Sequence, residues 1–318
     1  MEKGETIDEV ARAVPLGGAR VAEEIRREVR SEVEALGRDH GVVPGLVVVQ
    51  VGDDPASTVY VGGKVATSRE LGLRSEHRAL PAETDTRCLL AEVAELNARD
   101  DVDGILVQLP LPRGVDEGQV IEAIDPAKDV DGFHPLNVGR MIAGRAALVP
   151  CTPAGVFELL VREGVEIRGR HAVVVGRSHI VGRPMAHLLL QADATVTVCH
   201  SRTRDLAEET RRADILVCAV GCAGLVRGEH VKPGAVVVDV GMNRVTDEAA
   251  AREFFGEQSD ARVEAIRRRG YTLIGDVHPA EVGRVAGRLT PVPGGVGPLT
   301  IAMLMRNTVT AARRRRGL

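Results

Sequence analysis

Four short valine-rich runs recur through the second half of the chain, and this repetition constrains the fold more than any other feature. They cover residues 171–175, 195–199, 214–220 and 235–240, and the segments 184–191 and 206–212 between them have helical character. Continuous β-branched runs of this length are typical of strands that are covered on both faces. Strands that alternate with helices predict a parallel, doubly wound α/β layer, the architecture of nucleotide-binding domains.

The first half follows the same rhythm. Residues 19–37, 57–71 and 88–97 are predicted helices, and residues 46–51 and 104–109 are predicted strands, the second of which ends at Pro110. This order predicts an α/β layer with parallel pairing over the first ~145 residues. Residues 246–269 are rich in Ala, Glu and Arg and short of apolar spacing, so a surface helical excursion is expected there. A final helix is predicted over 300–312, and the arginines at 313–316 are expected to be a solvated, positively charged helix end.

Composition narrows the class of protein. The chain has 318 residues, enough for one large or two ordinary domains, and its net charge of −4 with 2% aromatic residues argues against nucleic-acid and membrane-surface partners. Its five cysteines form no paired CxxC or zinc pattern, so they are expected to be small buried residues and no metal is expected. Residues 1–14 lack the apolar core of a signal peptide, and no apolar run approaches the ~20 residues of a membrane span. We therefore expect a reduced, cytoplasmic protein.

A glycine-containing loop follows the first of the valine-rich runs and opens a helix. It begins Gly176-Arg177-Ser178-His179-Ile180, where the N–H groups of a helix N-terminus would hold a dinucleotide pyrophosphate. Ser178 occupies the place of the middle glycine of GxGxxG, so a plain strand-to-helix turn stays an alternative.

The next strand ends in polar donors. Ser201 and Arg202 follow it, where NAD-preferring folds often carry an acid for the ribose hydroxyl. Hydrogen-bond donors at that point, with Arg177 nearby, favour the 2′-phosphate of NADP. Plain surface charge is the alternative.

Tyr60 and Lys64 are spaced to lie on one face of the predicted helix 57–71. A phenol and an ammonium group would then flank one small volume, where a lysine can transfer protons. Gln108 ends an apolar strand, the place where ligands bind in open α/β sheets. Asp129 and Asp131 lie in a turn and could accept hydrogen bonds from the amino and ring N–H groups of a heterocycle. An exposed lysine, strand register and turn capping are the structural alternatives.

Taken in order, nine segments resemble the bifunctional methylenetetrahydrofolate dehydrogenase/methenyltetrahydrofolate cyclohydrolase family. They span nearly all of residues 19–312. The segments are VGDDPASTVYVGGK, GILVQLPLP, KDVDGFHPLNVGR, PCTPAGV, VVVGRSHIVGRPMAHLL, VTVCHSRT, ADILVCAVG, KPGAVVVDVGMNRV and LTPVPGGVGPLTIAMLMRNTV.

The resemblance implies an α/β protein of two domains with a cleft between them. An α/β catalytic, folate-binding domain would cover residues 15–148 and be completed by the C-terminal helix at 298–312. A Rossmann-like, doubly wound NADP-binding domain would cover residues 149–297. The implied activity is oxidation of 5,10-methylenetetrahydrofolate with NADP⁺, followed by hydrolysis to 10-formyltetrahydrofolate. The implied assembly is a homodimer.

The family's functional residues match positions of this chain. Lys64 matches the catalytic lysine, Gln108 the glutamine that adjusts it, Tyr60 the tyrosine that stacks on substrate, and Asp131 the carboxylate that holds the pterin. The cofactor positions are matched by Gly176, Arg177, Ser178, Ile180, Ser201 and Arg202. The loop beside folate and nicotinamide is matched by Pro293, Gly294, Gly295 and Gly297.

Two departures from the family pattern stand out. Gly62 and Gly63 replace a bulkier pair before Lys64, and glycine costs about 1 kcal/mol per position in a helix. The excursion at 246–269 is longer than the family's usual turn. The alternatives are the same fold with one activity lost, an NADP dehydrogenase of the shikimate or amino-acid type, and a non-catalytic folate- or nucleotide-binding protein.

Overall fold

The computed structural model describes residues 12–318, which form two compact units. The three-stranded unit comprises Gly18–Leu159, His179–Leu188 and Gly297–Leu318. The six-stranded unit comprises residues 12–17, Leu160–Ser178 and Leu189–Val296. Helices α6 (Cys151–Arg162) and α7 (Gly182–Gln191) each run from one unit into the other.

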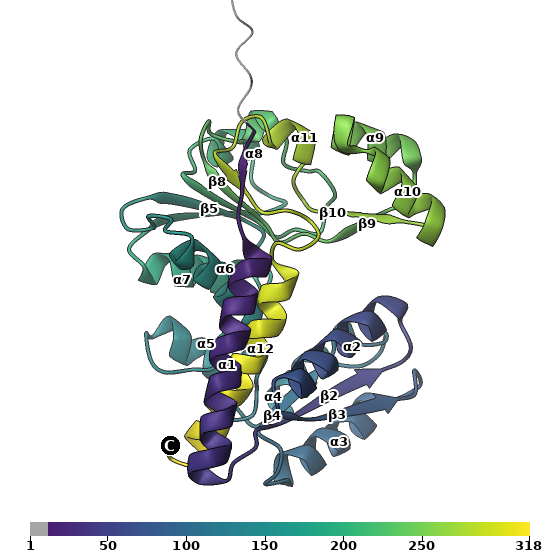
Figure 1. Cartoon of the computed structure of the whole chain (residues 1–318), viewed down its shortest axis with the longest axis vertical. Helices are drawn as coiled ribbons and strands as arrows, with labels where there is room; N and C mark the ends of the chain where they lie inside the picture. The colour runs from purple at the N-terminus through teal and green to yellow at the C-terminus, as the bar shows by residue number, and fades with distance from the viewer. Residues whose placement is uncertain (1–11) are drawn as a thin grey trace, which may run out of the picture. The chain divides into compact units, whose positions relative to one another are not determined.

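The six-stranded unit is built on a fully parallel sheet (Figure 1). Its strand order is β1-β11-β8-β7-β5-β6. Their bounds are β1 Val14–Pro15, β5 His171–Val175, β6 Thr195–Cys199, β7 Ile215–Cys218, β8 Val236–Asp239 and β11 Arg288–Leu289. The chain passes from β5 to β6 on one side and then returns to β7 on the other, so the topological switch point lies at β5. The predicted doubly wound α/β fold is confirmed.

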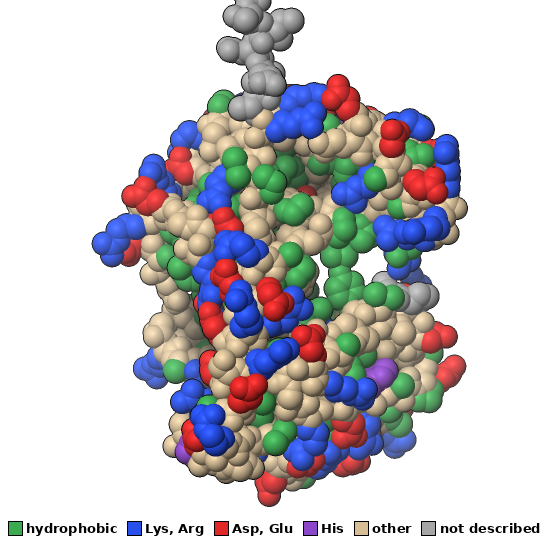
Figure 2. Space-filling model, viewed as in Figure 1, with side chains coloured by type: hydrophobic (Ala, Val, Ile, Leu, Met, Phe, Trp, Pro, Cys, Tyr) green, Lys and Arg blue, Asp and Glu red, His purple; other side chains and the backbone are tan. Residues whose placement is uncertain are grey.

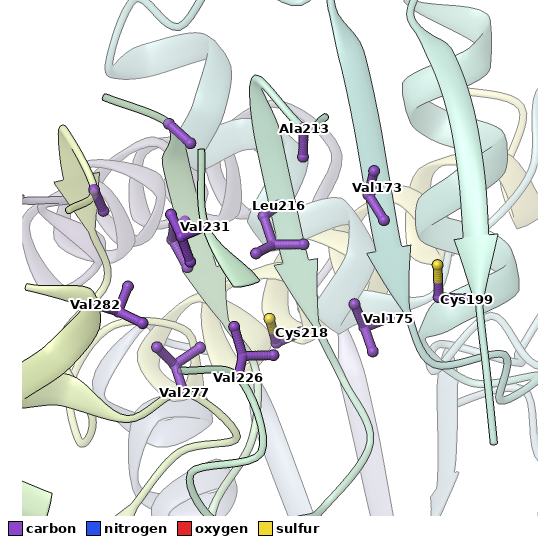
Figure 3. Close-up of a cluster of buried hydrophobic side chains, with 13 residues drawn as sticks. Val173, Val175, Cys199, Ala213, Leu216, Cys218, Val226, Val231, Val277 and Val282 are labelled. Carbon is purple, nitrogen blue, oxygen red and sulfur yellow. The ribbon is translucent and has the colours of Figure 1, made fainter. Parts of the chain in front are cut away.

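Aliphatic side chains and two cysteines fill the core of this sheet (Figure 3). Val173, Val175, Leu216 and Cys218 are all buried on neighbouring strands. The expectation of buried cysteines is right for Cys151, Cys199 and Cys218 and wrong for Cys88 and Cys222, which are exposed.

The excursion is more than a surface helix. It consists of β9 (Asn243–Val245), α9 (Glu248–Phe255), the short 3-10 turn η2 (Gly256–Gln258), α10 (Asp260–Arg269) and β10 (Thr272–Ile274), with β9 and β10 antiparallel. It has a small core of its own, made of Val245, Ala251, Phe255, Val263, Ile266 and Ile274. The expectation that it lacks apolar spacing was therefore wrong, because the apolar side chains are shared between two short helices and a hairpin. The same unit holds α8 (Leu206–Thr210), η1 (Gly228–His230) and α11 (Pro279–Val282).

The three-stranded unit contains a parallel sheet of order β3-β2-β4. The strands are β2 Gly45–Val51, β3 Arg74–Leu80 and β4 Gly104–Val107. The helices are α2 Pro55–Glu70, α3 Thr86–Ala98, α4 Glu117–Ala123 and α5 Pro135–Ile142. Strand β3 was not predicted, because its sequence RSEHRAL is rich in charged residues and lacks an apolar run. The structure tolerates these charges because β3 lies at the half-exposed edge of the sheet.

Helices α1 (Gly18–His40) and α12 (Gly297–Arg315) lie side by side in the same unit (Figure 1). The inner face of α1 buries Val21, Ile25 and Val29. Its outer face carries acidic and basic side chains next to one another (Figure 2), including the pair Arg20–Glu24. Within residues 12–318, no helix is both long and apolar enough to cross a membrane.

The end of α12 is anchored to a buried carboxylate. Arg315 donates to Asp103 Oδ1 at 2.6 Å and to the Val102 carbonyl at 2.7 Å, and Arg316 donates to Asp103 Oδ1 at 2.6 Å. Asp103 is 0% exposed and also accepts from the Gly45 N–H at 3.0 Å. The expected solvated helix end holds for Arg313 and Arg314, which are exposed. It is wrong for Arg315, which is only partly exposed, and incomplete for Arg316, because both are paired with a buried carboxylate.

Candidate active site

Lys64 and Gln108 are brought together by two adjacent strands of the three-stranded unit. Helix α2 follows the central strand β2 and is capped by Asp54, whose carboxylate accepts from the Ser57 N–H at 2.8 Å. Gln108 follows β4, the strand beside β2. The Lys64 Nζ donates to Gln108 Oε1 at 3.0 Å, and Gln108 Nε2 donates to the Leu109 carbonyl at 2.6 Å. The lysine is only 8% exposed, so its ammonium group is held in a fixed place.

Gly62 and Gly63 do not interrupt α2, which continues unbroken to Glu70. A Cβ added at Gly62 meets no atom within 4 Å. We expect Gly62→Ala to raise the free energy of unfolding by about 0.5–1 kcal/mol, because alanine loses less backbone entropy in a helix. Urea denaturation measures this, with Gly139→Ala in α5, which is equally open, as the matched control. A destabilised Gly62→Ala protein beside a stabilised Gly139→Ala protein would contradict the prediction.

The two aspartates of the turn before α5 have different tasks. Asp129 is buried, and its carboxylate accepts from the Asn137 side chain at 2.9 Å. It also accepts from the backbone N–H groups of Gly132, Phe133 and His134. Gly132 has a φ of +75°, and a Cβ there would lie 2.5 Å from backbone. Asp129 therefore shapes the turn, while Asp131 remains partly exposed.

Burial raises the pKa of Asp131 to about 6. The nearby Asp129 carboxylate raises this pKa further, whereas the Lys64 ammonium lowers it. Burial also raises the pKa of the Tyr60 phenol, which lies one helical turn before Lys64. At neutral pH the site therefore combines an ionised Asp131, a neutral phenol and the bonded pair Lys64–Gln108.

Two polar residues that sequence reasoning missed support this turn. Asn307 of α12 donates to the Val130 carbonyl at 2.8 Å and to the Val149 carbonyl at 2.9 Å. Cys151, at the start of α6, donates to the same Val130 carbonyl at 3.3 Å. The available signal for Asn307 was its place after the apolar run 301–305 of the final helix, because an amide buried there needs partners.

The predicted cofactor loop begins at the switch point of the six-stranded sheet. Gly176 follows β5 with a φ of +123°, and a Cβ there would lie 2.1 Å from the Ala219 carbonyl oxygen. Only glycine fits this backbone, because the loop after β5 passes so close to the Ala219 carbonyl. Arg177 and Ser178 follow and are exposed, and Ile180, partly buried, belongs to the three-stranded unit.

Ser201 and Arg202 lie beside that loop, because β6 pairs with β5 and Val175 is in register with Cys199. Both are exposed in a turn that follows β6. The turn is closed by His200, whose N–H donates to Thr203 Oγ1 at 2.9 Å and whose Nδ1 accepts from the Arg202 N–H at 3.1 Å. Exposed hydroxyl and guanidinium groups at this strand end suit a phosphate.

The loop after β7 is held by an aspartate that sequence reasoning missed. The Asp276 carboxylate accepts from the backbone N–H groups of Val220, Gly221 and Cys222, at 2.6, 3.0 and 2.8 Å. Asn243 of the excursion donates to the same carboxylate at 3.1 Å. Because β7 also neighbours β5, Asp276 shapes a second loop at the switch point.

The segment 291–297 forms a tight turn. The Gly295 N–H donates to the Pro291 carbonyl at 2.8 Å, and Gly294 has a φ of +101°. Pro293 is exposed, and Gly297 begins α12 in the three-stranded unit. Within the described part of the chain, no group of three or more His, Cys, Asp or Glu side chains could hold a metal ion.

Comparison with known families covers most of the chain. Residues 16–131 match the tetrahydrofolate dehydrogenase/cyclohydrolase catalytic domain, and residues 150–316 match the NAD(P)-binding domain of the same family. The bifunctional protein FolD of Koribacter versatilis is 54% identical over 96% of this chain and 98% of its own. That of Chlorobium chlorochromatii is 48% identical over 96% of this chain and 100% of its own.

Solved structures of the same family are similar to this chain over almost its whole length. The bifunctional FolD methylenetetrahydrofolate dehydrogenase/cyclohydrolase of Campylobacter jejuni is 42% identical, with a TM-score of 0.85 over 95% of this chain and 99% of that one. The Trypanosoma brucei enzyme, solved with NADP cofactor and inhibitor, is 40% identical, with a TM-score of 0.87 over 96% and 99% of the two chains. The resemblance inferred from the nine sequence segments is thereby confirmed, and the chain belongs to the tetrahydrofolate dehydrogenase/cyclohydrolase family.

Proposed function

We propose that this protein oxidises 5,10-methylenetetrahydrofolate to 5,10-methenyltetrahydrofolate with NADP⁺ and then hydrolyses the product to 10-formyltetrahydrofolate. The observation that carries the proposal is the partly buried Lys64–Gln108 hydrogen bond, formed in the same unit as Asp131 and Tyr60. Relatives that are about half identical along almost their whole length are named as bifunctional FolD proteins. The predicted activities agree with those for which the Campylobacter jejuni and Trypanosoma brucei structures are named, and the predicted cofactor agrees with the NADP bound in the Trypanosoma brucei structure.

The residues at the switch point fit NADP. Gly176 has a backbone that only glycine can adopt, at the end of β5 where the loop begins, and Ser201 and Arg202 present donors for a 2′-phosphate at the neighbouring strand end. Arg177, Ser178 and Ile180 would complete the contacts. When bound, the nicotinamide accepts the hydride.

In the oxidation, the methylene carbon that bridges N5 and N10 loses a hydride. The resulting cation is delocalised over both nitrogens, so no proton has to leave. The task of the protein is placement. The Asp131 carboxylate would accept from the pterin N–H groups, the Tyr60 ring would stack on the substrate, and the loop with Pro293, Gly294, Gly295 and Gly297 would border the folate.

In the hydrolysis, water adds to the methenyl carbon and the bond from that carbon to N5 breaks. The attacking water loses two protons as the formyl oxygen forms, N5 takes up one proton, and one proton is released. Lys64 would move these protons, and Gln108 would hold its ammonium group in place through the 3.0 Å hydrogen bond.

Folate binding should depend on the ionisation of Asp131. Its pKa of about 6 leaves the carboxylate charged above pH 6 and neutral below it. We therefore expect folate affinity to be constant from pH 7 to 8 and to fall about tenfold per pH unit below about pH 6. Binding isotherms from pH 5 to 8 measure this. Asp131→Asn should bind weakly at every pH, Asp116→Asn should follow the wild type, and a flat wild-type profile down to pH 5 would contradict the role of Asp131.

The proposal also includes the domain boundaries, the assembly and the location of the protein. The folate-binding domain would comprise residues 15–148 with the helix at 298–312, and the NADP-binding domain residues 149–297. The protein would act as a cytoplasmic homodimer, without nucleic-acid or membrane partners.

Two separate assays test the function. Purified protein is given 5,10-methylenetetrahydrofolate with NADP⁺ or NAD⁺, and reduced nicotinamide is followed by its absorbance. In the second assay, added methenyltetrahydrofolate is followed as it decays. Reduction with a preference for NADP⁺ together with accelerated decay is expected. Reduction alone would indicate that the cyclohydrolase activity has been lost, and the absence of both activities would favour a non-catalytic binding protein.

A further inference from the structure

Arg262 links the excursion, residues 243–274, to the loop 291–297. Arg262 lies on α10, and its Nη2 donates to the Val292 carbonyl at 2.8 Å. Its Nη1 donates to the Leu273 carbonyl at 3.3 Å. The guanidinium group lies over the Phe255 ring, 4.4 Å from the centroid. One side chain therefore joins α9, α10, the hairpin and the loop.

Holding the Arg262 guanidinium group in this position removes part of its hydration. Arg262 is partly buried, and burial lowers the pKa of its guanidinium group. Its guanidinium group contacts two backbone carbonyls and an aromatic ring. Phe255 belongs to the small core of the excursion, so the platform beneath the guanidinium group is itself packed. The partly buried cation therefore serves both the excursion, through Leu273 and Phe255, and the loop, through the Val292 carbonyl.

The loop that receives this bond has few other means of support. Pro291 and Pro293 have no N–H groups to donate. The turn is closed by the bond from the Gly295 N–H to the Pro291 carbonyl, and Thr290 ties its start to β8 through a 3.1 Å bond to the Val237 carbonyl. Val292 follows the attachment at Thr290 and lies inside the turn closed by Gly295. Arg262 donates to the Val292 carbonyl at this point.

We propose that Arg262 is a positioning residue, which fixes the Val292 carbonyl and so sets the conformation of the loop 291–297 against the folate. This inference rests on the proposed function, because it assumes that the loop borders the substrate. Displacements of about 1 Å can lower the rate of a reaction by 10²-fold when reacting groups are held for direct attack. The excursion would thus act as a brace for the substrate loop.

The variants are Arg262→Met, which keeps the length of the side chain without its donors, and Arg262→Lys, which keeps the charge. Arg267→Met is the matched control, because Arg267 lies on the same helix and pairs with Glu248 at 2.8 Å without contacting the loop. We expect Arg262→Met to raise the KM for methylenetetrahydrofolate at least about tenfold. Its affinity for NADP⁺ should change less than this KM, because most of the proposed cofactor contacts lie after β5 and β6. Arg262→Lys should be intermediate, and Arg267→Met should resemble the wild type.

Hydrogen exchange of the ligand-free protein gives a second readout that does not depend on activity. The amides of residues 294–297 should exchange faster in Arg262→Met than in Arg267→Met. Because KM does not depend on the concentration of active enzyme, partial unfolding of a variant does not invalidate the kinetic comparison. Equal KM values and equal exchange in the two methionine variants would overturn the inference while leaving an active wild type, and so the proposed function, intact. An inactive wild type with faster loop exchange in Arg262→Met would instead overturn the proposed function.

Discussion

Replacing Lys64 with methionine should lower cyclohydrolase turnover by about 10³-fold or more, within the range that a positioned proton-transfer group contributes. Methionine keeps most of the apolar stem, so the buried helix face stays filled, but the donor to Gln108 is lost. Without the ammonium group, the proton transfers of the hydrolysis have to pass through water. Decay of methenyltetrahydrofolate with Lys64→Met measures the loss.

The oxidation should be less affected. It needs no proton transfer, so Lys64→Met should retain measurable hydride transfer as long as the folate still binds. Lys232→Met is the control, because that lysine forms an ion pair with Asp214 in the six-stranded unit, at 2.6 Å. Wild-type cyclohydrolase turnover in Lys64→Met would show that the assignment of the lysine is wrong. An equal loss of both activities would place Lys64 in substrate binding rather than in proton transfer.

Asp103→Ala should destabilise the three-stranded unit by about 3 kcal/mol, the lower end of what is lost when one partner of a buried ion pair is removed. The Asp103 carboxylate accepts from Arg315, Arg316 and the Gly45 N–H. Removing it leaves two guanidinium groups and a strand N–H without their acceptor. Because both arginines keep some contact with solvent, the upper end of that range is not expected.

Denaturation in urea, followed by circular dichroism, measures this change. Asp101→Ala is the matched control, because Asp101 also pairs with an arginine, Arg99, at 2.9 Å, but lies at the surface. Exposed pairs contribute about 1 kcal/mol or less. Equal midpoints for Asp103→Ala and Asp101→Ala would contradict the assignment of a buried anchor for the end of α12.

The local pattern of apolar residues was sufficient to predict the doubly wound sheet from the sequence. Strands β5, β7 and β8 bury valine-rich segments, and such runs carry their own signal because both faces of a parallel sheet are covered. Strand β6 lies at the edge of the sheet, where only Cys199 is buried, so the expectation of cover on both faces is wrong for that strand. The pairing of Lys64 with Gln108 was also accessible, since a helix after one parallel strand and the end of the next strand meet at the same edge of a sheet.

Contacts between residues far apart in the sequence decided the roles of individual charged side chains. Asp129 and Asp131 look alike in the sequence, and only the folded turn uses one for backbone N–H groups and leaves the other partly exposed. In the same way, Arg315 looks like a solvated helix end until Asp103, more than two hundred residues away, supplies its partner.

The sequence by itself therefore determined the fold class, the family and the candidate reactive groups of this protein, because hydrophobic periodicity and short motifs are local properties. The tertiary structure decided which charged groups are paired, buried or left facing a ligand. It also decided that Arg262 reaches the loop 291–297 at the Val292 carbonyl. Those outcomes depend on which side chains meet across the fold, and the energy of a charge depends on the partners and the solvent that it finds there.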